Sequence, residues 1–194
     1  DLIELIERMV LPSDTHKVLV LSGSVPKGMD HAIYAELINK FQPVGVDCFL
    51  DASGEALLAG VQACPTLIKP NLAELETIAG HQLSESNEIV SLAKEQCQKG
   101  IRFVCVSKGS GGAILTDGEK TYFASGLNLN VRGIQGAGDS LLAGITAAWQ
   151  QNLSMPDMLL WGMAAAAGSI EHPGTGLCTQ ADFDRLVTQV NIEL

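Results

Sequence analysis

The sequence predicts an α/β fold with three layers, in which helices cover both faces of a mainly parallel sheet. Short apolar runs that end in Ser, Gly, Asp or Pro alternate along the chain with longer stretches of helical periodicity. The chain has 194 residues, of which 46% are hydrophobic and 18% charged, as in ordinary globular domains. We therefore expect a single domain over residues 1–194.

Four apolar runs are the expected parallel strands. They are KVLVLSG at 17–23, VDCFLD at 46–51, TLIKP at 66–70 and RFVCVSKG at 102–109. Runs with so few polar residues are typical of strands that are buried on both faces.

A β-hairpin is expected after the fourth strand. Asp117 and Gly118 separate two alternating segments, GAILTD at 112–117 and KTYFAS at 120–125. An Asp-Gly pair in this position favours a tight turn between antiparallel strands.

Helical periodicity fills the remaining segments. We expect helices over 2–10, 30–41, 54–63, 71–79, 84–99, 138–151, 155–171 and 180–191. Those between the strands are the crossovers that parallel pairing requires.

Charge and cysteine usage exclude several classes of protein. The net charge is 12 − 22 = −10, which disfavours binding to nucleic acid or to an anionic membrane. No apolar run is long enough for a transmembrane helix, and we expect a cytoplasmic protein. The five cysteines (48, 64, 97, 105 and 178) form no CxxC pair, which argues against a zinc site or a disulfide framework.

The segment GAGD at 136–139 is the strongest candidate for chemistry. Ligands of open α/β sheets bind beyond the carboxyl ends of the strands, and small residues before a helix allow an anion to approach its N–H groups. Asp139 would then be a carboxylate beside an anion site, which suits phosphoryl transfer to an alcohol. Alternatively, Asp139 is only an N-terminal helix residue that the helix dipole favours.

Two more segments follow strands. Asn71 and Glu74 share a helix face and offer oxygen ligands for Mg²⁺, or else they cap the helix. SKGSGG at 107–112 suits a phosphate or ribose, or else forms a tight turn into the hairpin. The small side chains of MAAAAGSI at 163–170 admit either a flat ligand or a closely packed helix.

In order along the chain, LSGSVP, DASGEAL, LIKPNLAEL, VSKGSGGA, GAGDSLLAG and HPGTGL resemble segments of the ribokinase-like carbohydrate kinases, the PfkB family. The wording of DASGEAL and LIKPN is most similar to the branch with 1-phosphofructokinase, tagatose-6-phosphate kinase and the minor 6-phosphofructokinase. The resemblance implies ATP-dependent phosphorylation of a phosphorylated ketohexose, with fructose 1-phosphate as first choice and tagatose 6-phosphate or fructose 6-phosphate as alternatives.

The resemblance also implies roles for individual residues. Asp139 would be the catalytic base, and the backbone of Gly136, Ala137 and Gly138 the anion hole for the transferred phosphoryl group. Asp51 would lie with Asp139 at the sugar substrate. Asn71 and Glu74 would organise Mg²⁺, through water.

The implied ATP site comprises Ser107, Lys108, Gly109, Ser110, Gly111 and Gly112, with Met163 and Ala167 on the adenine wall. The loops at 133–135 and 169–176 match a monovalent-cation site, which suggests K⁺. One departure is Ile134, which stands where the family usually carries Thr.

Family members are longer, and their extra length precedes the matched region. We therefore expect this chain to be the C-terminal, nucleotide-side portion of the fold, without the N-terminal strands and the lid over the sugar. The resemblance implies a homodimer for the full-length protein. Two rival functions are a non-catalytic nucleotide-binding module and, with less support from the glycine pattern, an NAD-dependent oxidoreductase.

Overall fold

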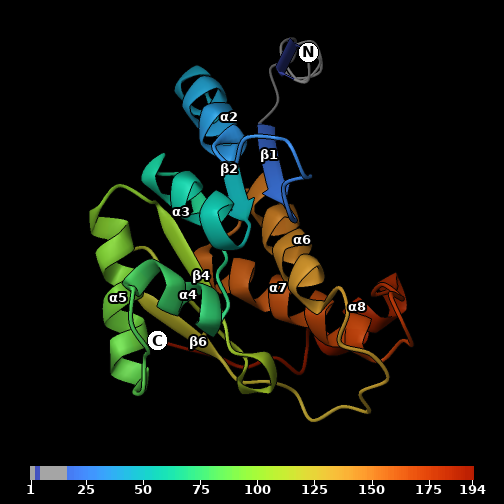
Figure 1. Ribbon diagram of the computed structural model, residues 1–194. Coiled ribbons are helices and arrows are strands. Elements are labelled where there is room, and N and C mark those ends of the chain that lie inside the picture. The colour runs from blue at the N-terminus through green and yellow to red at the C-terminus, as the bar shows by residue number, and fades with distance from the viewer. Residues whose placement is uncertain (1–2, 5–16) are drawn as a thin grey trace.

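A seven-stranded mixed sheet lies at the centre of the computed structural model, which describes residues 3–4 and 17–194 (Figure 1). The strand order follows the chain, from β1 to β7. The parallel strands are β1 (Lys17–Ser22), β2 (Val46–Asp51), β3 (Leu67–Ile68) and β4 (Phe103–Ser107). The α/β fold predicted from the sequence is confirmed. The helix expected over 2–10 falls mostly outside the described residues.

The second part of the sheet is antiparallel. The hairpin predicted around Asp117 and Gly118 forms from β5 (Ala113–Thr116) and β6 (Thr121–Ala124). A further strand, β7 (Ile192–Glu193), pairs with β6. The parallel arrangement therefore extends only from β1 to β4, and the sheet is mixed.

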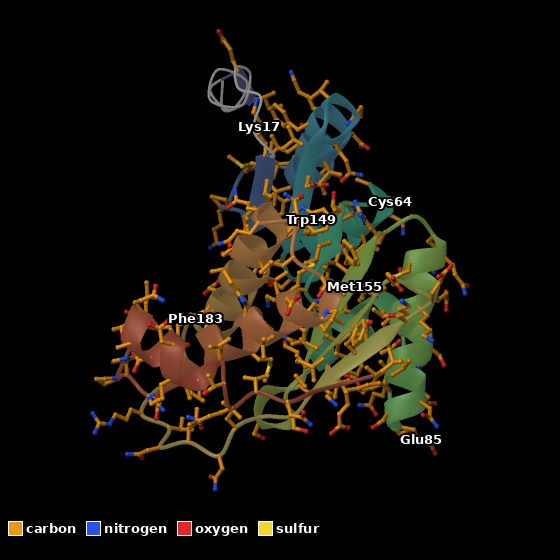
Figure 2. The ribbon with its side chains drawn as sticks, turned by 180° about the vertical axis from the view of Figure 1, so that it is seen from behind. Lys17, Cys64, Glu85, Trp149, Met155 and Phe183 are labelled. Atoms are coloured by element: carbon orange, nitrogen blue, oxygen red, sulfur yellow. The ribbon has the colours of Figure 1, made fainter. Side chains whose placement is uncertain are left out.

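Helices cover both faces of the sheet, as Figures 1 and 2 show, and the three layers are confirmed. One layer contains α2 (Ile33–Phe41), α3 (Gly54–Gln62), α4 (Leu72–Ala79) and α5 (Ser86–Gln98). The other contains α6 (Ala137–Gln150) and α7 (Met155–Ile170), with α8 (Gln180–Leu186) against α7. In Figure 2, Phe183 of α8 and Glu85 before α5 lie on opposite flanks.

Alternating strand residues build a core on each side of the sheet. Leu50 and Val104 face the layer of α2, α3 and α5, where they meet Phe41. Phe49 and Cys105 face α6 and α7. Because both faces bury apolar side chains, the strands read as continuous apolar runs.

The last predicted helix was wrong in length. It was expected over 180–191 but ends at Leu186, where the Gln189 N–H donates to the Leu186 carbonyl oxygen in a turn. The chain can then reach β6, with Ile192 opposite Ala124. A two-residue strand is too short to show a period of its own.

Close contact between α6 and α7 fixes the position of α6 under the sheet. A Cβ atom at Gly144 would lie 2.4 Å from the Trp161 carbonyl oxygen, and one at Gly162 would lie 2.9 Å from that of Leu141. The two backbones can approach this closely only because both residues are glycines. This packing sets where the first turn of α6, with Gly138 and Asp139, meets the strand ends.

Candidate active site at the carboxyl ends of the parallel strands

A hollow of about 230 Å³ lies where β1 and β2 end and α4 and α6 begin. Its lining includes Ser22, Asp51, Glu74 and Asp139. These side chains come from separate segments, and the parallel topology brings them to one edge of the sheet. Three of these four, Asp51, Glu74 and Asp139, are site residues named in the sequence analysis.

Gly136 starts α6 in the left-handed region, with φ of 76°. This conformation turns the chain into the helix, and Asp139 follows in its first turn. First-turn N–H groups have no acceptor within their own helix, so they can bind an anion that arrives at this end.

Asp139 is exposed at the mouth of the hollow. Its one side-chain hydrogen bond within the described residues is long: the Ser22 hydroxyl donates to Oδ1 over 3.4 Å. The carboxylate is therefore accessible to a ligand, as a base that accepts a substrate proton must be.

Lys69, a buried residue behind the lining of the hollow, was not predicted from the sequence. Its side chain is only 5% exposed, and its Nζ lies 3.0 Å from Asp51 Oδ2. A Cβ atom at Gly138 would lie 3.2 Å from the same Nζ, so the ammonium lies against the first turn of α6. A lysine within the apolar run TLIKP was the available signal, because a buried lysine requires a partner.

The Asp51 carboxylate responds to three influences. Burial raises its pKa, Lys69 at 3.0 Å lowers it, and the nearby Asp139 raises it, with burial the largest effect. The net result is a pKa above the usual range of an aspartate. The Lys69 ammonium therefore favours the charged form of Asp51, whereas burial opposes it.

Asn71 and Glu74 form a complete capping box at the start of α4. The Asn71 Oδ1 accepts the Glu74 N–H at 2.9 Å, and the Glu74 Oε2 accepts the Asn71 N–H at 2.9 Å. The interpretation of Asn71 and Glu74 as a helix cap is thus confirmed. Oε1 of Glu74 makes no hydrogen bond to the described residues, and Glu74 also lines the hollow. One carboxylate oxygen thus remains for a water-mediated Mg²⁺ contact.

The predicted nucleotide turn lies beside Asn71. The Ser107 N–H donates to the Pro70 carbonyl oxygen at 3.0 Å, and the Lys108 N–H donates to that of Gly112 at 2.8 Å. Gly112 has φ of +89°, and a Cβ there would lie 1.9 Å from the Ala124 carbonyl oxygen. The turn therefore tolerates only glycine at 112, while Gly109, Ser110 and Gly111 remain exposed.

The small residues of α7 are used for packing in this structure. Met163 is buried in the core between α6, α7 and the sheet, and Ala167 is buried against α8 with Leu186. Neither residue lines the hollow.

The two loops for which the family resemblance implies a cation site lie against each other. The Arg132 N–H donates to the Ile170 carbonyl oxygen at 2.8 Å. A Cβ at Gly133 would lie 3.0 Å from the carbonyl oxygens of both His172 and Gly174. The two carbonyl oxygens of His172 and Gly174 thus lie on one side of Gly133. Ile134 on the same segment is 73% exposed.

Residues 3–4 and 17–194 contain neither a metal-binding side-chain cluster nor a helix that could span a membrane. No three His, Cys, Asp or Glu side chains gather there in a way that could hold a metal ion. No helix in that part of the chain is both long and apolar enough to cross a bilayer.

The fold and the site define an α/β protein with a glycine-rich helix start, an exposed carboxylate and a buried ammonium at one sheet edge. Residues 9–182 match the model of the pfkB family carbohydrate kinases. The chain belongs to this family.

Relatives and solved structures agree with this assignment. The chain is 31% identical over 180 residues to 1-phosphofructokinase of Haemophilus influenzae, which covers 92% of this chain and 58% of the relative. It is also 31% identical to ATP-dependent 6-phosphofructokinase isozyme 2 of Escherichia coli, covering 93% and 59%. A crystal structure of phosphofructokinase-2 from Escherichia coli with potassium superposes with a TM-score of 0.89 at 30% identity, covering 96% of this chain and 61% of that one. The chain thus spans under two thirds of these relatives.

Proposed function

We propose that this chain is the nucleotide-side portion of an ATP-dependent kinase that phosphorylates a sugar phosphate. The observation that carries the proposal is the position of Asp139: an exposed carboxylate in the first turn of α6, beside the Lys69 ammonium under Gly138. Phosphoryl transfer needs such a base next to positive charge.

The residues of the chain would act as follows. Asp139 accepts the proton of the attacking hydroxyl. The N–H groups at the start of α6 and the Lys69 ammonium stabilise the negative charge on the transferred group. Glu74 holds Mg²⁺ through water, and the turn at 107–112 contacts the nucleotide. When bound, Mg·ATP supplies the phosphoryl group.

The substrate that we propose is a phosphorylated ketohexose, with fructose 1-phosphate first. The Haemophilus influenzae relative is a 1-phosphofructokinase, and the Escherichia coli relative of equal identity is a 6-phosphofructokinase. Fructose 6-phosphate and tagatose 6-phosphate are therefore the alternatives. We also propose K⁺ at the carbonyls of His172 and Gly174, since an Escherichia coli neighbour was solved with potassium. Self-association is proposed too, because that neighbour also has a tetrameric inhibited form.

The test is Asp139→Asn in the protein that carries this chain, with Asp184→Asn as the matched control on the exposed face of α8. Turnover with the three sugar phosphates should fall by about 10²–10⁴-fold in Asp139→Asn, because the amide cannot accept the proton. Binding of Mg·ATP, measured by calorimetry, should change little. Unchanged turnover in Asp139→Asn would refute the proposal that Asp139 is the catalytic base. Binding of Mg·ATP without turnover in the unaltered protein would favour a non-catalytic module.

A further inference from the structure

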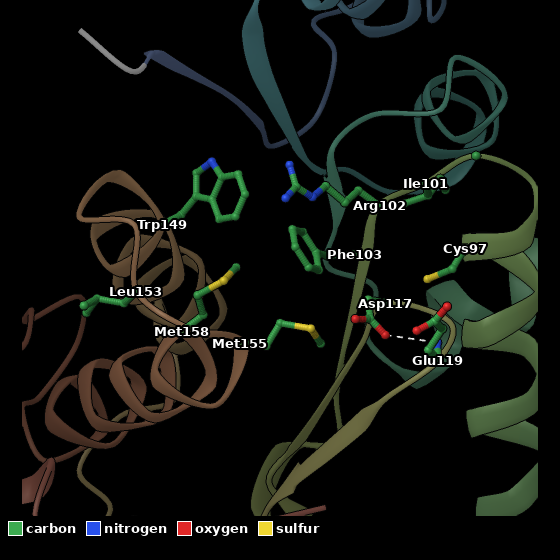
Figure 3. Close-up of a pocket in the computed structure, with 11 residues that line it drawn as sticks. Cys97, Ile101, Arg102, Phe103, Asp117, Glu119, Trp149, Leu153, Met155 and Met158 are labelled. Carbon is green, nitrogen blue, oxygen red and sulfur yellow. Dashed lines mark hydrogen bonds between the residues drawn. The ribbon is translucent and has the colours of Figure 1, made fainter.

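A second, larger hollow lies at the opposite edge of the sheet, outside the proposed active site. Its volume is about 590 Å³, and it opens between the start of β4, the β5–β6 turn, the end of α6 and the start of α7 (Figure 3). Helix α6 runs from the proposed active site to this hollow. Its 14 residues correspond to about 21 Å, which separates the two sites. Their linings have no residue in common.

Arg102 lies at this hollow and makes no ion pair with any described residue. Its guanidinium carbon lies 4.7 Å from the Trp149 ring centroid and 5.1 Å from that of Phe103. The guanidinium is held against two aromatic rings, and without an ion-pair partner among the described residues its N–H donors remain available to a ligand. Those donors match the two oxygens of a carboxylate.

The wall behind Arg102 is held in place. The Trp149 indole N–H donates to Asp47 Oδ2 at 2.8 Å, and its ring meets Phe103 edge to face, with centroids 5.4 Å apart. An aromatic wall that is already ordered loses little conformational entropy when a ligand binds to it.

Two carboxylates contribute the opposite charge. Asp117 and Glu119 belong to the β5–β6 turn and line the same hollow. Asp117 Oδ1 accepts the Glu119 N–H at 3.0 Å, which orders the turn, and the Glu119 side chain is exposed. Met155 and Met158 from α7 provide an apolar surface between the turn and Trp149 (Figure 3).

We propose that this hollow binds a zwitterionic α-amino acid with an apolar side chain. Its carboxylate pairs with Arg102, its ammonium with Asp117 and Glu119, and its side chain rests on Phe103 and Met155. A ligand that carries only a carboxylate is repelled by Asp117 and Glu119 and has no ammonium to offset this repulsion. A ligand that carries only an ammonium is repelled by Arg102. The mixed charge therefore selects against both.

The test uses the fluorescence of Trp149, with L-phenylalanine as the probe. The chain has two tryptophans, and Trp161→Phe makes Trp149 the only one. We expect a saturable change in Trp149 emission on titration to about 10 mM, a range that detects millimolar dissociation constants. Phenethylamine and 3-phenylpropionate, which each lack one charge, should bind at least about tenfold more weakly.

Two variants in the Trp161→Phe background locate the binding. Arg102→Gln should weaken L-phenylalanine binding about tenfold or more, and Glu119→Gln should weaken it less, because Asp117 remains. Arg132→Gln, at an exposed arginine elsewhere, should bind like the parent. Lack of a saturable change, equal binding of the three probes, or equal binding by Arg102→Gln would overturn the proposal. The readout needs no kinase activity, so failure of the proposed function would not affect it.

Discussion

The buried pair of Lys69 and Asp51 allows a sharp test of the candidate site. In Lys69→Met, Asp51 keeps a carboxylate whose side chain is 15% exposed but loses the ammonium 3.0 Å away. Breaking a buried pair on one side costs about 3–5 kcal/mol. Because Asp51 retains some contact with water, we expect a loss of about 3 kcal/mol in the free energy of unfolding at pH 7.

The loss should depend on pH in a definite direction. Burial raises the pKa of Asp51, and Lys69 opposes this rise, so the pKa should rise further in Lys69→Met. A carboxyl group whose folded pKa exceeds its unfolded value favours the folded state only while it is protonated. The penalty in Lys69→Met should therefore be small near pH 4, about the unfolded pKa of an aspartate, and should grow as the pH rises through the folded pKa.

Urea denaturation at a series of pH values measures this directly. Asp51→Asn combined with Lys69→Met removes both charges, and it should recover most of the stability that Lys69→Met loses at pH 7. A loss under about 1 kcal/mol in Lys69→Met, or the same loss at pH 4.5 and pH 7, would show that the pair is not effectively buried.

Three further outcomes are expected. Gly112→Ala should lower the free energy of unfolding by about 3 kcal/mol or more, because the new Cβ atom would lie 1.9 Å from the Ala124 carbonyl oxygen. Gly109→Ala, where a Cβ atom meets open space, should lower it by about 1 kcal/mol. Urea denaturation of the two variants measures the difference. Hydrogen bonds, above all from the Thr179 hydroxyl, lower the pKa of Asp182, so the free energy of unfolding should decrease as the pH falls below about 4. In Asp182→Asn, the urea midpoint should depend less on pH in this range. Glu74→Gln should raise the Mg²⁺ concentration at half-maximal rate, and an unchanged Mg²⁺ profile would leave Glu74 with the capping role alone.

Much of the fold could be predicted because each parallel strand carries its own signal. The runs at 46–51 and 102–109 are mostly apolar, since both faces of these strands are covered. The run at 17–23 shows the same pattern although it forms the edge strand β1, in which Val20 is 43% exposed. The hairpin was predicted from Asp117 and Gly118, two residues whose conformational preferences are local. β7 could not be predicted, because its two residues are ordered only by pairing with β6.

The candidate site was predictable where a residue type has a local reason to be there. Gly136 and Asp139 are marked by the helix that follows them, and Asn71 and Glu74 by the spacing of a capping box. Lys69 was not predicted as a site residue because its partner, Asp51, is remote in sequence and lies on the neighbouring strand. Pairings of this kind exist only once the parallel register has formed, so no local pattern reveals them.

The electrostatics of the candidate site give a physical reason for a lysine in a buried position. The chain has a net charge of −10, yet the proposed substrates are both multiply charged anions. The hollow itself contains Asp51, Glu74 and Asp139, so unaided it would repel a phosphate. The Lys69 ammonium compensates Asp51, and the N–H groups at the start of α6 add partial positive charge at the place where we propose that the phosphoryl group binds. Burial of Lys69 also removes it from solvent screening, so its charge acts on the site more strongly than a surface lysine would. The proposed base, Asp139, makes no ion pair with the described residues, because the ammonium that neutralises Asp51 lies behind the backbone of Gly138.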